Sequence, residues 1–280
     1  MSPERYSLLE AKDSKGTIDT QELSANQPAR ETIGRLIKQS RYRRSTIESP
    51  NTAIEIEGKK FTIERIEDGD SPDVPKVLEL FYVGFDAAEV ETEESFKNSI
   101  EGRTEFGTPV TPYIIFAVKD EEGKIISAFG GTLLDFEGSD NQSEKECALQ
   151  VWYIVSDKTI RQNGIARELY ISGLMQAVQE ADAQNKKLTF AIGECASTAE
   201  VFWNKVGWKR IYLEKGNKRT YEELRYIQPP MRWNTETGEI AEDTHEVAQH
   251  FMIDSMGPST HTKQNFLQSS LAFMEGYAWP

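Results

Sequence analysis

The residues best suited to hold a ligand form the short segment Arg161-Gln162-Asn163-Gly164-Ile165-Ala166. Before it, residues 148–155 are aromatic and β-branched, which predicts a mostly buried strand. After it, apolar residues recur at helical spacing up to a polar stop at 183–185, which predicts a helix that begins at the glycine. A helix start has unpaired amides and a partial positive charge, so this loop could hold an anion, usually a phosphate. Gly164 would let that ligand approach the backbone closely because it has no Cβ, and the small side chain of Ala166 also leaves room for it.

A second segment favours this interpretation over an ordinary strand-to-helix turn. Residues 188–192 indicate another short buried strand, and residues 197–208 a short helix ended by Gly207. Together the two segments resemble the GNAT superfamily of acyl-CoA N-acyltransferases. Residues 161–166 match the pyrophosphate loop of that family, and its second cofactor motif is matched by Ala199, Phe202, Trp203, Lys205, Gly207 and Trp208.

The order of the other predicted elements is the GNAT order. Alternation predicts a strand over 60–67, helical spacing predicts a helix over 74–85, and a hairpin signal at 120–123 separates strands over 113–119 and 124–136. Two further strands, over 209–214 and 221–227, follow the short helix. The resemblance covers roughly residues 60 to 227. It implies an α+β (α/β/α) GNAT fold, a mixed and mostly antiparallel sheet of about seven strands flanked by helices, with N- and C-terminal helical extensions.

We expect three parts in the chain. Residues 1–50 are expected to be a polar tail up to Asn26 and a basic helix over 31–44, which docks onto its own acidic core or a second subunit, or binds a partner or membrane surface. Residues 51–228 are the acyltransferase domain. Residues 229–280 are predicted to be a helical extension packed on the core or on a second subunit of a homodimer, with helices over 243–256 and 262–274.

The charge and hydropathy of the chain limit the classes of binding partner that we expect. The net charge is −14 at pH 7, and the acidic excess lies after residue 50, so nucleic acid is not an expected partner. An acidic surface favours a cationic amine acceptor, on a small molecule or a peptide, although it equally serves solubility. The sequence has no membrane-length apolar run and no signal-peptide core, which predicts a cytoplasmic enzyme without a membrane partner.

Cysteine and histidine usage predicts neither a disulfide nor a metal site. If their strands run parallel, as the resemblance implies, Cys147 and Cys195 lie at opposite ends of the sheet, so we expect free thiols. His245 and His250 are misaligned on a helix, and no cysteine or carboxylate cluster completes a metal site around them.

The family resemblance implies transfer of an acetyl group from acetyl-CoA to a primary amine by direct attack in a ternary complex. A backbone N–H at Ile154, Val155 or Ser156 would polarise the thioester carbonyl. Val155 lies six positions before Arg161 where the family has five, so either a bulge intervenes or Ser156 takes the position. The implied cofactor-binding residues are Ile154, Val155, Ser156, Arg161, Gln162, Asn163, Gly164, Ile165, Ala166 and Trp203.

The proton-transfer residues of the family are not found at their usual positions. The base position falls on Gln150 or Leu149, neither of which accepts a proton at neutral pH, and the tyrosine acid is replaced by Trp203, which we expect against the pantetheine arm. Two alternatives therefore remain, a regulatory protein that binds acyl-CoA without turnover and a transferase that uses a longer acyl-CoA. The candidates for the base are Glu194, Glu146, Asp135 or water, and those for the acid are Ser197, Thr198 or water.

Overall fold

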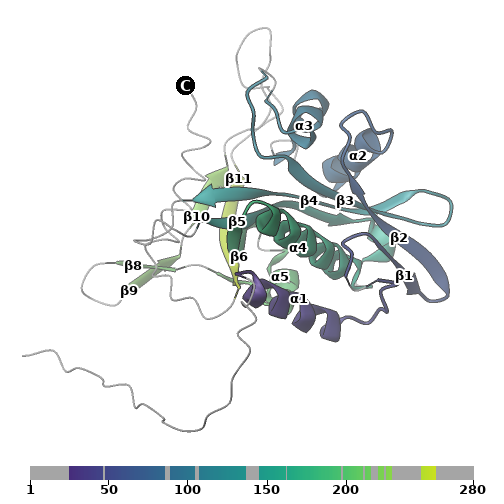
Figure 1. Cartoon of the computed structure of the whole chain (residues 1–280). Helices are drawn as coiled ribbons and strands as arrows, with labels where there is room; N and C mark the ends of the chain where they lie inside the picture. The colour runs from purple at the N-terminus through teal and green to yellow at the C-terminus, as the bar shows by residue number, and fades with distance from the viewer. Residues whose placement is uncertain are drawn as a thin grey trace, which may run out of the picture.

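The computed structural model describes residues 25–256 except 47, 86–88, 105–106, 137–144, 162, 197, 211, 216–219, 224 and 229–246. A nine-stranded sheet with helices on both faces forms this part of the chain (Figure 1). Its strands run in the order β1-β2-β3-β4-β5-β6-β11-β10, and β7 also pairs with β11. Neighbouring strands are antiparallel except β5 and β6, which are parallel. The nine strands are β1 Thr52–Ile56, β2 Lys59–Ile66, β3 Tyr113–Lys119, β4 Ile125–Phe136, β5 Lys145–Ser156, β6 Lys186–Cys195, β7 Lys209–Arg210, β10 Arg225–Gln228 and β11 Val247–Ser255.

The helices divide between the two faces of the sheet. On one face α4 packs across β3 to β6 and α1 packs on α4, while α2 and α3 cover the other face (Figure 1). A separate two-stranded sheet pairs β8 with β9. No helix of the described residues is both long enough and apolar enough to span a membrane. The remaining bounds are α1 Gln27–Gln39, α2 Val74–Gly84, α3 Glu93–Ile100, α4 Ile165–Ala183, α5 Glu200–Val206, β8 Tyr212–Lys215 and β9 Thr220–Glu223.

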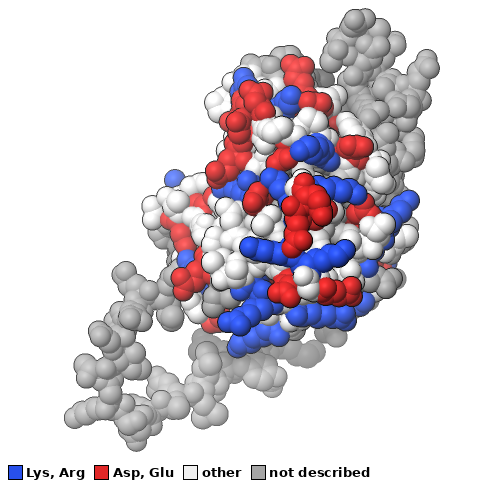
Figure 2. All heavy atoms as spheres, turned by 90° about the vertical axis from the view of Figure 1, so that its right-hand side faces the viewer, with Lys and Arg blue, Asp and Glu red and all other residues white. Residues whose placement is uncertain are grey.

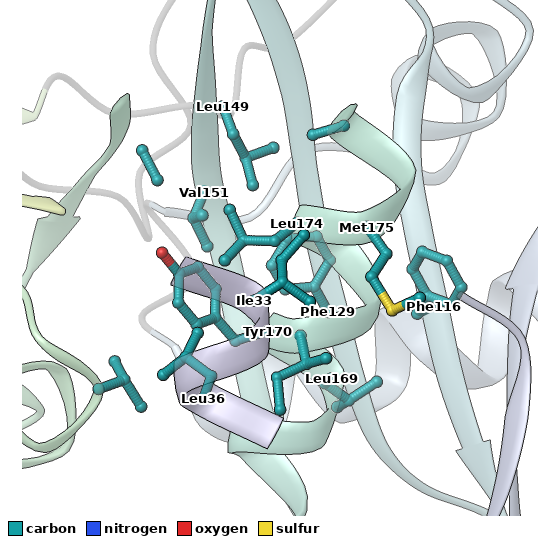
Figure 3. Close-up of a cluster of buried hydrophobic side chains, with 14 of the residues drawn as sticks. Ile33, Leu36, Phe116, Phe129, Leu149, Val151, Leu169, Tyr170, Leu174 and Met175 are labelled. Carbon is teal, nitrogen blue, oxygen red and sulfur yellow. The ribbon is translucent and has the colours of Figure 1, made fainter. Parts of the chain in front are cut away.

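Helix α4 is buried on nearly all sides because it lies between the sheet and α1. Leu174 and Met175 point toward sheet residues such as Phe129, while Ile33 and Leu36 of α1 cover its other side (Figure 3). Such a helix has apolar residues around its whole circumference. The start of α4 is therefore held in place on two sides by packing.

Gly173, in the middle of α4, is required by close packing against the sheet. A Cβ here would lie 2.5 to 3.0 Å from three ring atoms of Phe129. Overpacking by the added methyl group should cost about 1 to 3 kcal/mol. The gain of about 1 kcal/mol in helix propensity offsets only part of this cost, so we expect Gly173→Ala to destabilise the fold. Gly34 in α1 is the matched control because no atom of the described residues lies within 4 Å of its Cβ position, so Gly34→Ala should stabilise slightly. Urea unfolding measures both variants, and equal stability of the two would contradict this packing.

The predicted GNAT order of elements from residue 60 to the short helix is confirmed, with ends shifted by a few residues. Both cysteines are free and buried, as expected. The strand over 209–214 is only partly correct, since β7 has two residues in the main sheet and 212–215 pair with β9 instead. The predicted helix over 262–274 and His245 lie outside the described residues.

The helix predicted over 243–256 is wrong, because residues 247–255 form β11. This strand lies between β6 and β10 and is bonded on both sides. Phe251 and Met252, adjacent in sequence and pointing to opposite faces, are both buried. A strand buried on both faces lacks apolar alternation, so its pattern does not separate it from a helix. The sheet thus includes residues from the part predicted as a helical extension.

The N-terminal boundary also differs from the prediction. The helix runs over 27–39 and not 31–44, and Asn26, placed in the polar tail, is 0% exposed. The Asn26 side-chain amide donates to Asp182 at 2.7 Å and to the Lys186 carbonyl at 2.9 Å, and its oxygen accepts from the Leu188 amide at 2.6 Å. These bonds fasten the start of α1 to the turn between α4 and β6. Residues 1–24 lie outside the described part of the chain.

Candidate active site

Strands β5 and β6 separate halfway along their length. Their parallel register ends where Val151 lies opposite Gly193. Beyond that point β6 pairs only with β11 up to Cys195, while β5 pairs only with β4 up to Ser156. The separation opens a cleft of about 940 Å³, and residues 150–156 line it.

A bulge in β5 lies at the start of the separated segment. Gly131 of β4 lies opposite Val151 and Gly130 opposite Tyr153, so Trp152 is the extra residue. The bulge turns both Trp152 and Tyr153 toward the α2 side, whereas Val151 and Ile154 pack on the α4 side. The bulge lies before Val155, so it is not the bulge that the spacing predicted between Val155 and Arg161, where a 3-10 turn at Lys158–Ile160 is found.

The backbone of β5 presents alternate residues to the cleft. The Asp157 amide donates to the Ile126 carbonyl of β4 at 2.8 Å, which makes these two residues a hydrogen-bonded pair. In an antiparallel pair such residues alternate with ones whose amides point away. The regular register from Tyr153 to Ser156 therefore directs the backbone amide of Val155 toward β4, and the amides of Ile154 and Ser156 toward the cleft. Three backbone amides were predicted to donate to the thioester carbonyl. Of these, the amides of Ile154 and Ser156 lie on the cleft side.

The loop before α4 opens onto the same cleft. Gly164 has a φ of +86° and no side chain of a described residue caps the helix, so the amides of Ile165 and Ala166 are left for a ligand. Arg161 Nε donates to the Ser156 carbonyl at 3.2 Å, which holds the loop against the end of β5. Ile165 and Ala166 also line the cleft. Gln162 lies outside the described residues.

Residues 40–44, which we call the strap, form a wall of the cleft that the motifs do not include. Arg41 and Tyr42 line the cleft, and the Tyr42 hydroxyl donates to the Asn163 carbonyl. Only the basic run at 41–44 marks the strap in the sequence. The strap fixes the shape of the loop that precedes α4.

A buried ion pair fastens the strap to α4. Arg44 Nη1 lies 3.2 Å from Glu168 Oε2, and the two side chains are 0% and 1% exposed. Arg44 also donates to Ser172 Oγ at 2.8 Å, and the Ser40 hydroxyl donates to Glu168. Both charges therefore have several polar partners, as buried charges require.

Carboxyl and aromatic groups line the opposite side of the cleft. Glu194 follows Gly193, the last residue of β6 that pairs with β5. Burial, reinforced by the charge of Glu89, raises the pKa of Glu194 to about 8. The Tyr153 hydroxyl donates to the Glu89 carbonyl at 2.7 Å. Phe85 packs edge-on against Tyr153, with ring centroids 5.2 Å apart. Glu194 is thus a carboxyl poised to exchange a proton near neutral pH.

The other two candidate bases do not line the cleft. Glu146 is buried opposite Phe136 and Lys187, five residues before Val151, which is about 16 Å along a strand. Asp135 forms an ion pair with Lys186 at 2.6 Å. Both belong to the closed end of the sheet, so neither can reach a reaction at the separation of β5 and β6.

Helix α5 closes the cleft with aromatic residues. Trp203 lines the cleft, is 4% exposed, and its ring centroid lies 4.2 Å from that of Trp208. Cys195 lines the cleft as well, but burial raises its pKa to about 12, so it stays a thiol and is a poor nucleophile. Of the candidate acids, Thr198 lines the cleft and Ser197 lies outside the described residues.

No family model and no curated protein matches this sequence. Among solved structures, Arabidopsis thaliana NAA60 in complex with acetyl-CoA is 10% identical, with 71% of this chain and 99% of that chain covered and a TM-score of 0.47. Glucosamine-6-phosphate N-acetyltransferase from Arabidopsis thaliana is 17% identical, with 57% and 99% covered and a TM-score of 0.38. A glucosamine N-acetyltransferase region of a fungal multi-domain β-N-acetylglucosaminidase is 11% identical, with 54% of this chain and only 17% of that chain covered and a TM-score of 0.39.

The order and direction of the strands identify the fold. Four antiparallel strands lead to one parallel pair that separates beside a glycine-started helix, in the order that the sequence resemblance implied. The chain has the GNAT fold. In this chain the strand that pairs with the far side of β6 is β11, and the N-terminal strap completes the loop side of the cleft.

Proposed function

We propose that this protein is an N-acetyltransferase that moves an acetyl group from acetyl-CoA to a primary amine on a small molecule or peptide. The observation that carries the proposal is one cleft with two chemically different sides. Unpaired helix amides and basic residues lie on one side, and the Glu194 carboxyl lies on the other, with the free edge of β5 between them. This is the layout that a phosphate-bearing thioester and an amine require.

The cofactor would occupy the loop side of the cleft. Its pyrophosphate fits the amides of Gly164, Ile165 and Ala166 at the start of α4. Four cationic side chains that line the cleft add charge complementarity, namely Arg41, Arg161, Arg167 and Lys205. The pantetheine arm would lie along the free edge of β5 and against Trp203, which brings the thioester carbonyl to the amides of Ile154 and Ser156.

The reaction needs no covalent enzyme intermediate. The amine nitrogen attacks the thioester carbonyl carbon, a C–N bond forms, and the C–S bond breaks to release the CoA thiolate. Glu194 accepts the proton that the ammonium must lose, directly or through water, while Thr198 or water returns a proton to the thiolate. The high pKa of Cys195 argues against an acetyl-cysteine route.

We expect Glu194→Gln to lower kcat/KM about 100-fold or more, because a missing general base typically costs that much. A base with a pKa of about 8 is protonated below that pH, so native activity should rise with pH up to about 8 and then level off. This rise should be absent in the variant. The measurement is a pH profile of thiol release for both proteins with the same amine. Asp135→Asn, at the closed end of the sheet, is the control and should keep the native profile.

Acetyl-CoA binding and turnover test the proposal as a whole. Calorimetry with acetyl-CoA should show binding, and a panel of amines should release free CoA thiol. Tight binding without thiol release for any amine would instead support a regulatory acyl-CoA-binding protein. Faster turnover of longer acyl-CoA esters would assign a different acyl donor, and absence of binding would overturn the proposal.

A further inference from the structure

Alternate residues of the strap are fastened to α4 and to the loop before it. The side chains of Ser40, Tyr42 and Arg44 each make a hydrogen bond or an ion pair there. Just before the strap, the Gln39 carbonyl accepts from Arg167 Nη1 of α4 at 2.7 Å. The backbone between these anchors is therefore held in a fixed place at the mouth of the cleft.

The two residues between the anchors, Arg41 and Arg43, have exposed side chains. Of the two, only Arg41 lines the cleft. Within the part of the chain that the structure describes, the Arg41 guanidinium has no ion pair and no hydrogen bond. Burial raises the pKa of the Tyr42 hydroxyl, and the charge of Arg41 partly opposes that rise. Since that hydroxyl donates to Asn163, an uncommitted arginine lies beside the phosphate loop.

The other cations of the cleft are placed differently. Arg161 Nε donates to the Ser156 carbonyl at 3.2 Å, and Arg167 donates to a backbone carbonyl at the end of α1. Both guanidinium groups are thus held against the backbone on either side of the loop. Lys205 belongs to α5, the helix whose Trp203 closes the cleft. Arg41 is the cation that the strap adds to this set.

The strap lies at the end of the loop that faces away from β5. Arg161 ties the loop to the end of β5, whereas Asn163 ties it to Tyr42 of the strap, whose ring lies next to Gly164. If the pyrophosphate occupies the loop and the pantetheine arm follows β5, the nucleotide leaves the loop toward the strap. Arg41 is then the arginine at the nucleotide end of the cofactor.

The nucleotide of CoA carries a third phosphate, on the 3′ position of its ribose. Such a monoester has close to two negative charges near pH 7, because its second pKa is about 6. The planar fork of an arginine matches the geometry of phosphate oxygens and can bind two of them at once. The uncommitted donors of Arg41 therefore suit this group.

The rest of the protein does not attract such an anion. The net charge of the chain is −14. On the face that Figure 2 shows, acidic and basic side chains intermix, so this outer surface has no uniformly positive field. A phosphate that lies outside the loop therefore needs a particular cation that the fold holds in place.

We infer that the Arg41 guanidinium binds the 3′-phosphate of CoA, so that the strap makes the protein select CoA over 3′-dephospho-CoA. This inference rests on the proposed use of acetyl-CoA and adds the residue that distinguishes its nucleotide. Neither cofactor motif includes this residue, which lies 120 positions before Arg161 in the sequence.

Two nucleotides that differ by one phosphate test the inference. CoA and 3′-dephospho-CoA share the pyrophosphate and the pantetheine arm. In calorimetry at constant ionic strength, we expect the native protein to bind CoA at least about tenfold more tightly, the effect of one charge-assisted contact. Equal affinity for the two nucleotides would overturn the inference alone. If neither nucleotide binds, the proposed acetyl-CoA-dependent function fails as well, so the two failures are distinguishable.

Arg41→Met assigns the preference to this residue. The variant should bind CoA about tenfold more weakly and 3′-dephospho-CoA within about twofold of the native Kd, so that the preference disappears. Thermal unfolding should be unchanged, because the Arg41 side chain has no hydrogen bond or ion pair to lose among the described residues. Arg43→Met is the matched control, since it removes the same charge from the next exposed position of the strap, outside the cleft.

The control variant should keep the native ratio of the two Kd values. Equal weakening of both nucleotides by Arg41→Met would assign Arg41 to the pyrophosphate or to the shape of the strap, and would overturn the inference. The same holds if Lys205→Met abolishes the preference while Arg41→Met keeps it, because the 3′-phosphate would then lie at α5.

Discussion

Replacing Gly164 with glutamate is expected to weaken CoA binding at least 100-fold while the protein remains folded. Two effects act together. A side chain at φ +86° strains the turn by about 1 to 2 kcal/mol, and a carboxylate at the start of α4 repels the pyrophosphate that the helix amides would hold. A 100-fold loss corresponds to about 2.7 kcal/mol. Calorimetry with CoA measures the effect directly.

Gly164→Ala separates strain from charge. Among the described residues the added Cβ meets only Tyr42 Cε2, at an ordinary 3.5 Å, and it brings no charge. We expect this variant to lose affinity by about tenfold or less, and thermal unfolding should show both variants folded. Native affinity for CoA in the glutamate variant would remove the phosphate site from this loop.

Replacing Arg44 with methionine should lower the free energy of unfolding by about 3 to 5 kcal/mol, because it leaves Glu168 buried without its countercharge. The change also removes the donor to Ser172. Urea unfolding followed by circular dichroism measures the loss. This is the largest stability effect that we expect from a single substitution in this protein.

The double variant Arg44→Met with Glu168→Gln tests the cause. A neutral amide at position 168 has no charge to compensate and keeps a hydrogen-bonding group for Ser40. We expect this variant to recover half or more of the lost stability, since replacing both partners of a buried pair costs far less than removing one. A double variant as unstable as Arg44→Met would mean that Arg44 stabilises the fold through packing and its other hydrogen bonds, and not by compensating the charge of Glu168.

Much of the fold was predictable because its signals are local. The loop from Arg161 to Ala166 follows a strand rich in branched and aromatic residues and precedes a long helix, and all three elements form where the pattern put them. Strand β2 and helix α2 also carry their own periodicity, and a local hairpin signal separates β3 from β4. These patterns need no knowledge of distant neighbours.

The rest depends on contacts between segments far apart in the chain. Whether Glu194 or Glu146 reaches the cleft depends on where β5 leaves β6, which pairing determines and composition does not. The bulge at Trp152 depends on the register with Gly130 and Gly131 of β4. Asn26 is a polar residue in sequence and a buried cap of the turn after α4 in three dimensions.

The strap also limits how far the protein can be shortened at its N-terminus. A shortened protein that begins at residue 51, where the sequence places the start of the acyltransferase domain, would lack Arg41, Tyr42 and Arg44. It would lose a wall of the cleft and the countercharge of Glu168 in one cut. Gene designs, fragment screens and homologue searches for this protein should therefore begin no later than Asn26, so that the buried amide, the first helix and the strap remain with the sheet that they complete.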